Sequence, residues 1–224
     1  MTLFDLVASR DNAGLQKAIA DDKTAAAARN AEGASLLAFA AYNGNADAIA
    51  SIRAALPSID AYEAIIVGEL ARVKELLDEG WDGNALAPDG FTPLGLAAFF
   101  SRKDIFDLLL PITRDVNERA KNPQQVAALH AAAAVRAIGA INLLLRAGAD
   151  PNLPQQQGFV ALHTAAIHGD ALMTGLLLLF GADPALRDAS GKSAADHARA
   201  NGQDWLAVRL DKASPPAKTA APPA

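Results

Sequence analysis

Apolar residues recur along most of the chain at helical spacing, in short blocks separated by Gly, Pro, Asn and Asp. Within residues 92–98, Leu94, Ala97 and Ala98 fall at positions i, i+3 and i+4, and the Leu-rich block 105–109 repeats this spacing. The chain is 51% hydrophobic but only 5% aromatic, because most apolar residues are Ala and Leu. Both are strong helix formers, and strand-favouring residues are scarce, so we expect an all-α fold of short amphipathic helices.

Several of these blocks are copies of one another. Ala128–Ala133 reads ALHAAA and Ala161–Ala166 reads ALHTAA, and their histidines, His130 and His163, lie 33 residues apart. A third copy, Thr92–Ala98, reads TPLGLAA. Each copy is followed by a Leu-rich stretch, and two of these stretches run on into the letters GADP. Self-similarity at a fixed period predicts a repeat architecture.

With Thr92 as the reference position of one copy, about seven copies can be placed. Successive copies start 33, 24, 33, 35, 33 and 33 residues apart. Their starts lie near Thr2, Ser35, Ile59, Thr92, Ala127, Val160 and Ser193.

This pattern resembles the ankyrin repeat, whose period is 33 residues and whose signature contains Thr-Pro-Leu-His followed by Ala. The resemblance covers residues 1–212 and is strongest in copies four to six. It implies an α-solenoid of helix-turn-helix repeats joined by short β-hairpin loops, with the first and last copies as caps. The residues suit that fold: the Thr92 hydroxyl can cap a helix, Pro93 fits a first helical position, and Gly148 and Gly181 fit the ends of second helices.

The chain departs from a regular array in three places. The 24-residue interval removes the hairpin after the second copy, so we expect an irregular joint near residues 56–60. The 35-residue interval places two extra residues in the loop 118–126. Residues 213–224 read ASPPAKTAAPPA, cannot form a core, and are predicted to be a flexible tail.

Charge and composition exclude several function classes. The net charge of −5 and the pI near 5.3 provide no basic face for nucleic acid. Without Cys there is no disulfide framework, and no apolar run approaches the roughly 20 residues of a membrane span. With no secretory leader visible, a cytoplasmic location without membrane attachment is expected. The Ala-rich composition resembles that of bacterial examples of the family.

No constellation indicates catalysis, a cofactor or a metal. The resemblance implies that His130 and His163 hydrogen-bond the backbone between repeats, and their spacing does not suit a shared metal ion. Gly191-Lys192-Ser193 imitates the end of a phosphate loop, but Leu186 stands where that loop needs Gly. Carboxylates are scattered, and no Ser or Thr is marked as a nucleophile. We therefore expect a non-catalytic chain.

The family resemblance also places a binding face. In each repeat it assigns three variable positions to the concave surface: the residue before the Thr-like position and the two after the paired Ala. In copies four to six most of these are apolar, and Tyr42 is one such position in the second copy. A contiguous exposed apolar patch marks an interaction site. The partner-binding candidates are Phe91, Phe99, Phe100, Val126, Val135, Phe159, Ile167 and His168.

Three interpretations of this patch remain open. It binds a protein or peptide partner, it pairs weakly with a second copy, or its side chains pack between helices, for which Phe99 is the prime candidate. Trp81 suits either an exposed anchor or packing across its hairpin, and Trp205 is expected to seal the C-terminal end of the core. The favoured function is a protein–protein interaction module acting as a scaffold or regulator. A small-ligand-binding protein or enzyme is the weaker alternative, since no site supports it.

Overall fold

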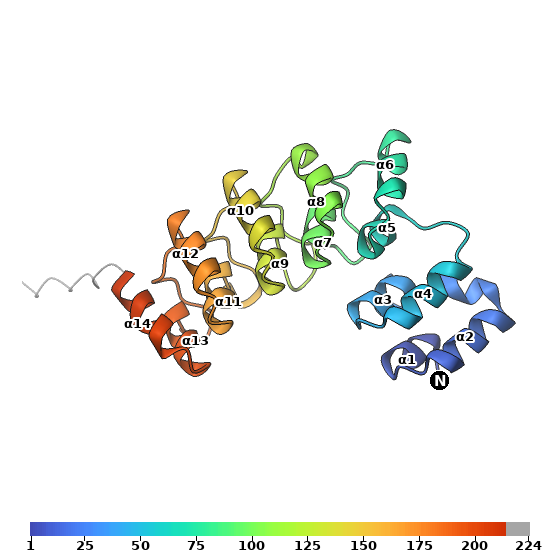
Figure 1. The fold of residues 1–224 in the computed structure, drawn as a ribbon, viewed down its shortest axis with the longest axis horizontal. Helices are drawn as coiled ribbons and strands as arrows, with labels where there is room; N and C mark the ends of the chain where they lie inside the picture. Colours follow the sequence, from blue (N-terminus) through green and yellow to red (C-terminus); the bar gives the residue numbers. More distant parts are fainter. Residues whose placement is uncertain (214–224) are drawn as a thin grey trace, which may run out of the picture.

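The computed structural model describes residues 1–213 and, within them, seven successive helix-turn-helix pairs (Figure 1). In each pair an inner helix of six or seven residues precedes an outer helix of seven to ten. The inner helices are α1 (Leu3–Ala8), α3 (Leu36–Tyr42), α5 (Ala61–Val67), α7 (Pro93–Phe99), α9 (Ala128–Ala134), α11 (Ala161–Ile167) and α13 (Ala194–Ala200). The outer helices are α2 (Asn12–Asp21), α4 (Ala46–Ala55), α6 (Leu70–Asp78), α8 (Lys103–Leu109), α10 (Ile138–Arg146), α12 (Ala171–Leu179) and α14 (Asp204–Ala213).

The loops contain short 3-10 turns but no extended strands in the described residues. The turns are η1 (Lys23–Ala27), η2 (Leu110–Ile112) and η3 (Gln156–Gly158). The predicted all-α solenoid is confirmed. Its hairpins are reduced to turns, with isolated bridges between Arg29 and Ser35 and between Arg187 and Ser193. The predicted tail at 213–224 lies outside the described residues, apart from Ala213 at the end of α14.

Polar caps explain where most inner helices begin. The side chains of Thr2, Ser35, Thr92 and Ser193 each accept the N–H of the third helical residue, as expected for an N-cap. The third inner helix is capped by Asp60, one residue after the start predicted near Ile59, and Glu63 completes a capping box. Each such cap contributes about 1 kcal/mol.

Two inner helices start without a polar cap residue, and in each a histidine at the third helical position accepts the N–H of the N-cap residue instead. In α9 the Ala127 N–H donates to Nδ1 of His130 at 3.1 Å, and Nε2 of the ring lies 2.8 Å from the Leu153 carbonyl oxygen of the following loop. His163 does the same in α11, with 3.1 Å from the Val160 nitrogen and a carbonyl contact at 3.2 Å. The implied backbone-bonding role of both histidines is therefore confirmed.

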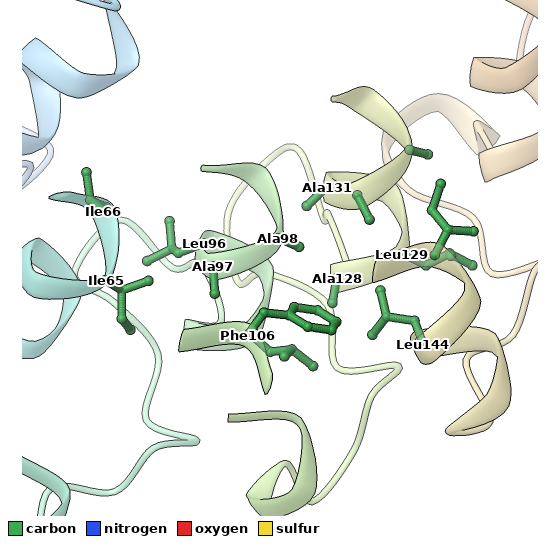
Figure 2. Close-up of a cluster of buried hydrophobic side chains, with 14 of the residues drawn as sticks. Ile65, Ile66, Leu96, Ala97, Ala98, Phe106, Ala128, Leu129, Ala131 and Leu144 are labelled. Atoms are coloured by element: carbon green, nitrogen blue, oxygen red, sulfur yellow. The ribbon is translucent and has the colours of Figure 1, made fainter. Parts of the chain in front are cut away.

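The core is a continuous row of small and branched side chains between the helices (Figure 2). Ala97 and Ala132 are fully buried, and their small size lets successive inner helices approach closely. Ile141 and Leu144 of the outer helix α10 are fully buried, and Leu96 of α7 lies toward Ile66 of α5 (Figure 2). Each such fully buried aliphatic side chain stabilises the fold by about 1.5–3 kcal/mol.

The turn between inner and outer helices requires a left-handed residue. Its φ lies between 54° and 72° in six of the repeats. Glycine, which adopts this conformation without strain, occupies the position in only three of them. In order along the chain the residues are Arg10, Gly44, Ser101, Arg136, Gly169 and Gly202.

Backbone hydrogen bonds between loop tips tie together the repeats from the third onward, which we call the C-terminal array (α5–α14). Each tip donates one N–H to a carbonyl of the preceding tip, at 2.8 to 3.0 Å. The bonds run from Lys121 to Gly90, from Gln156 to Gln124 and from Ala189 to Gln157.

The first two repeats, which we call the N-terminal block (α1–α4), join this array differently. Residues 56–60 lead from α4 into α5 without a hairpin, which confirms the predicted irregular joint, and Figure 1 shows the block turned away from the direction of the array. Between described residues, no loop-tip backbone bond crosses the joint. Arg53 instead pairs with Glu69 at 2.5 Å, and Arg29 with Asp60 at 2.9 Å.

Candidate functional site

A pocket of about 250 Å³ opens on the side of the inner helices α7, α9 and α11. The array bends toward this side in Figure 1. Most of the wall is apolar, and Gln155 and Thr164 supply polar groups. Three predicted partner-binding residues line it, namely Phe91, Phe99 and Val126.

Tyr42 forms one wall of this pocket from the second repeat. At the C-terminal end of α3, its ring reaches past the third repeat to the fourth, with centroids 5.2 Å from Phe100, 6.2 Å from Phe99 and 6.4 Å from Phe91. Its hydroxyl donates to Oδ2 of Asp89 at 3.2 Å. Burial, reinforced by the Asp89 carboxylate, raises the Tyr42 pKa, so the hydroxyl stays a donor. Tyr42 thus closes the pocket toward the N-terminal block.

Phe99 is more exposed than the sequence predicted. It is 38% exposed, whereas Phe91 and Phe100 are partly buried and pack against the core. The prediction that Phe99 is the residue most prone to pack between helices is wrong. Phe100 is the C-cap of α7 and packs beneath Tyr42, which leaves Phe99, in the last turn of the helix, facing the pocket.

The remaining predicted residues do not line this pocket. Val135 is half-buried at the C-cap of α9, Ile167 is half-buried at the end of α11, and His168 is exposed as the α11 C-cap. Phe159 belongs to another cluster, with its ring 5.2 Å from His163 and 5.0 Å from the ring of α13's histidine. The predicted set therefore divides into a pocket group and a more distant group.

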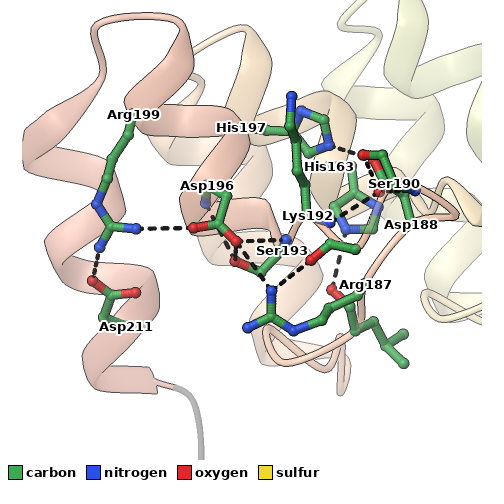
Figure 3. Close-up of polar contacts among 12 residues, drawn as sticks. His163, Arg187, Asp188, Ser190, Lys192, Ser193, Asp196, His197, Arg199 and Asp211 are labelled. Carbon is green, nitrogen blue, oxygen red and sulfur yellow. Dashed lines mark hydrogen bonds and ion pairs between the residues drawn. The ribbon is translucent and has the colours of Figure 1, made fainter.

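That second cluster lies at the C-terminal end of the array (Figure 3). His197 Nε2 lies 2.7 Å from Asp188 Oδ2, and its ring stands 5.4 Å from that of His163. The other carboxylate oxygen of Asp188 accepts from Ser190 Oγ at 2.7 Å and from the backbone nitrogens of Ser190 and Lys192 at 2.8 and 3.0 Å. The Ser190 bond, with these other donors, lowers the Asp188 pKa.

Serine, aspartate and histidine meet here, but in the wrong order for nucleophilic catalysis. Ser190 donates to the carboxylate and not to His197, so no base receives the hydroxyl proton. Asp188 instead holds its own turn closed, as an Asx-turn does, and fixes it to α13. Ser193, the end of the phosphate-loop-like triplet, is the N-cap of α13, accepting from the Asp196 nitrogen at 3.2 Å.

The two capping histidines are held neutral. Burial lowers the pKa of both His130 and His163. Because Nδ1 accepts a backbone N–H in each ring, the proton of the neutral form sits on Nε2 and is donated to a carbonyl. In residues 1–213 no group of three or more His, Cys, Asp or Glu could hold a metal ion.

Both tryptophans are placed by the structure. Trp81 packs edge-on against Tyr62 at 5.8 Å, across the third loop. Trp205 is 44% exposed on the outer side of α14, with Arg209 5.3 Å above its ring. The expectation that Trp205 seals the core is wrong, because the buried positions of α14 are taken by Leu206, Ala207 and Leu210.

Comparison with known proteins agrees with this architecture. Two models described as ankyrin repeats match residues 61–155 and 144–198. The palmitoyltransferase Hip14 of Drosophila melanogaster is 34% identical over 99 residues, which is 44% of this chain and 15% of that protein. Within the described residues no helix combines the length and apolar character of a membrane span. Ankyrin repeats are in general non-catalytic modules for protein interaction, and the chain belongs to this family.

Proposed function

We propose that the chain is a non-catalytic binding module that holds a protein or peptide on its inner face. The observation that carries this proposal is the pocket walled by Tyr42, Phe91, Phe99 and Val126. Exposed aromatic side chains around a concave site are typical binding hot spots. The volume of about 250 Å³ is below the roughly 300–1,000 Å³ of small-molecule sites and suits one large apolar side chain of a partner.

Polar groups at the same pocket suit the main chain of that partner. The side chains of Gln155 and Thr164 line the pocket, and neither side chain makes a hydrogen bond within the described residues. An amide and a hydroxyl free in this way can bond the backbone beside the inserted side chain. The partner is therefore a segment with one large apolar residue in an extended or loop conformation.

A cytoplasmic location is part of this proposal. The activity in the name of the Drosophila relative is not carried over, because the chain spans only 15% of that protein.

The test is peptide display against the wild-type chain, followed by affinity measurements on selected peptides. We expect the peptides to share one large apolar residue. Phe99→Asp should weaken their binding by about 30-fold or more, the effect of losing a hot spot worth about 2 kcal/mol. Leu143→Asp is the matched control, because Leu143 is 39% exposed, close to the 38% of Phe99, and lies on an outer helix. Equal binding by the Phe99 variant would refute the assignment.

A further inference from the structure

The outer helix α12 carries the most exposed leucines of the described chain, on the side away from the pocket. Leu172 is 66% exposed and Leu179 is 78% exposed. They lie seven residues apart, two helical turns, and therefore on one face, with the exposed Gly175 between them. Leucines exposed to this degree and aligned on one face form an apolar patch that no other element of residues 1–213 covers.

Other outer helices show that this face is not required by the fold. The outer helices α6, α8 and α12 can be compared position by position by counting from their N-cap residues, Glu69, Arg102 and Asp170. At the positions of the apolar face, α6 and α8 expose mainly charged side chains instead. The matching residues are Ala71, Lys74 and Asp78 in α6, and Asp104 and Asp107 in α8.

The next outer helix, α14, continues the apolar character at two of the three positions. In the same register it exposes Trp205 and Val208, at 44% and 50%, and Lys212 stands at the position of Leu179. The outer helices α12 and α14 follow one another at the C-terminal end of the array (Figure 1), after α10, whose matching residues are Gly139, Asn142 and Arg146.

Gly175 has no explanation within one copy of the chain. A Cβ atom placed on it would meet nothing within 4 Å, and its backbone is helical. A glycine inside a helix destabilises that helix relative to alanine. A second helix crossing at this point would use the missing side chain, since glycine allows close approach of another backbone.

Charge decides which partner suits this face. Residues 171–182 contain no charged side chain, whereas the chain as a whole has a net charge of −5. Two copies therefore repel each other in general, but not where α12 faces α12. An isologous contact puts the same patch on both sides, so it needs a self-complementary surface. An uncharged face with two leucines around a central glycine meets that need.

We infer that the outer face of α12 is the site through which two copies of this chain pair. The helices cross antiparallel at Gly175, so that Leu172 of each copy lies near Leu179 of the other. Trp205 and Val208 of α14 flank the contact. This surface is separate from the pocket of the inner face, so each copy of the pair keeps that pocket open.

The test is sedimentation velocity of the full chain from about 1 µM to about 300 µM, which covers weak to moderate association. The wild type should convert from monomer to dimer. Leu172→Ser with Leu179→Ser should weaken pairing by about 100-fold or more, because both apolar contacts of the face are lost. Both residues are largely exposed, so circular dichroism should show an intact fold.

Gly175→Ala separates pairing from helix stability. The alanine should raise the melting temperature of the monomer, yet weaken pairing by about 10-fold because its methyl group holds the helices apart. Lys74→Ser with Asp78→Ser, in the same register on α6, is the control and should leave pairing unchanged.

Several results would overturn the inference. They are a wild type that stays monomeric throughout, a dimer unaffected by the serine substitutions, and a dimer lost in Phe99→Asp instead. Flotation with phosphatidylcholine–phosphatidylserine vesicles adds one more. A monomeric wild type that floats through Leu172 and Leu179 would assign the face to a lipid surface. None of these results bears on peptide binding by the inner pocket except the loss of the dimer in Phe99→Asp.

Discussion

The N-terminal block and the C-terminal array are built from the same helix pair but are held together differently. In the array, backbone bonds between loop tips supplement the packing of inner helices at three successive positions. At the joint after α4 the hairpin is missing, and partly exposed ion pairs such as Arg53–Glu69 take its place. Surface ion pairs contribute only about 0–1 kcal/mol each. Neighbouring repeats are therefore coupled more strongly within the array than across the joint.

This difference has a functional side, because the pocket lies where the two regions meet. Tyr42 belongs to the block, whereas Phe91, Phe99 and Val126 belong to the array. In a repeat protein each unit contacts mainly its neighbours, so a contact from the second repeat to the fourth depends on the bend between them. The shortened link thus shapes the pocket as well as weakening the coupling.

The largest expected effect comes from cavities in the two regions. Ile52 in α4 and Leu144 in α10 are both fully buried, and truncation to alanine should destabilise the chain by about 2–5 kcal/mol in each case. For Ile52→Ala we expect faster hydrogen exchange in α1–α4 and unchanged exchange in α9–α12, because the joint couples the stabilities of the two regions only weakly. Leu144→Ala should instead affect the array. Equal acceleration throughout the chain in both variants would show that the two regions unfold as one.

A smaller effect is expected from cutting the contact across the joint. Tyr42→Ala removes the ring contacts with Phe91, Phe99 and Phe100 and should cost about 1–3 kcal/mol. Tyr42→Phe keeps the rings and loses only the bond to Asp89, about 0.5–1.5 kcal/mol. In urea the alanine variant should unfold in two separate steps by circular dichroism. If phenylalanine is as damaging as alanine, the hydroxyl and not the ring holds the joint.

The left-handed turn position can be substituted in one repeat of each region, and each substitution should change the free energy of unfolding by about 1 kcal/mol. Ser101 in the array has a φ of 54°, and Ser101→Gly should stabilise by relieving a left-handed conformation. Gly44 in the block has a φ of 59° with open space around its Cα, so Gly44→Ser should destabilise by a similar amount through strain alone. Thermal melts of the two variants should shift in opposite directions.

The mildest perturbation is weak acid, and through the histidines it should act on the array alone. All four histidines lie after residue 129, and burial lowers the pKa of His130, which faces Arg119, and of His163, which faces His197 and Asp188. The unfolded chain takes up protons below about pH 6.5 while the folded rings resist them, so stability falls as the pH drops through that value. Urea unfolding at about pH 7.5 and about pH 5.5, followed by the fluorescence of Trp81 and Trp205, measures this.

The carboxylate of Asp188 acts at lower pH. Its folded pKa lies below the usual value, so its stabilisation is complete above the unfolded pKa and is lost as the pH falls toward the folded one. A stability loss confined to pH values below about 4 would exclude the histidines and point to Asp188 together with the other carboxylates whose pKa the fold lowers, namely Asp5, Asp22, Asp82, Asp170 and Asp196.

The repeats could be predicted from the sequence because their signals are local. The capping residue Thr92, the period of 33 and the buried Ala pairs each act within one or two repeats, and the missing hairpin was visible as a short interval. The exposure of Phe99 could not be predicted, because it depends on Tyr42 crossing from the second repeat. Trp205 was misplaced because a register position alone does not show which side of a terminal helix remains uncovered.

The candidate site was predictable in part for the same reason. Family register identified Phe91, Phe99 and Val126, which line one pocket, and also Phe159, which packs on two histidine rings. The position of a residue in the repeat predicts the face of the helix on which it lies. The contacts of its side chain depend also on the neighbouring repeats, which the position alone does not give.

The missing hairpin also determines how the molecule responds to tension. A force pulling its two ends apart passes along the stack, and in the array it must shear helix packing and the bonds between loop tips. Residues 56–60 carry the load without a hairpin. Around them the described residues supply side-chain packing and the ion pairs Arg29–Asp60 and Arg53–Glu69, but no backbone bond between loop tips. The first extension under load is therefore the swing of α1–α4 away from α5, which separates Tyr42 from Phe99 and opens the pocket. In this geometry, tension would act first on the pocket that we propose as the binding site.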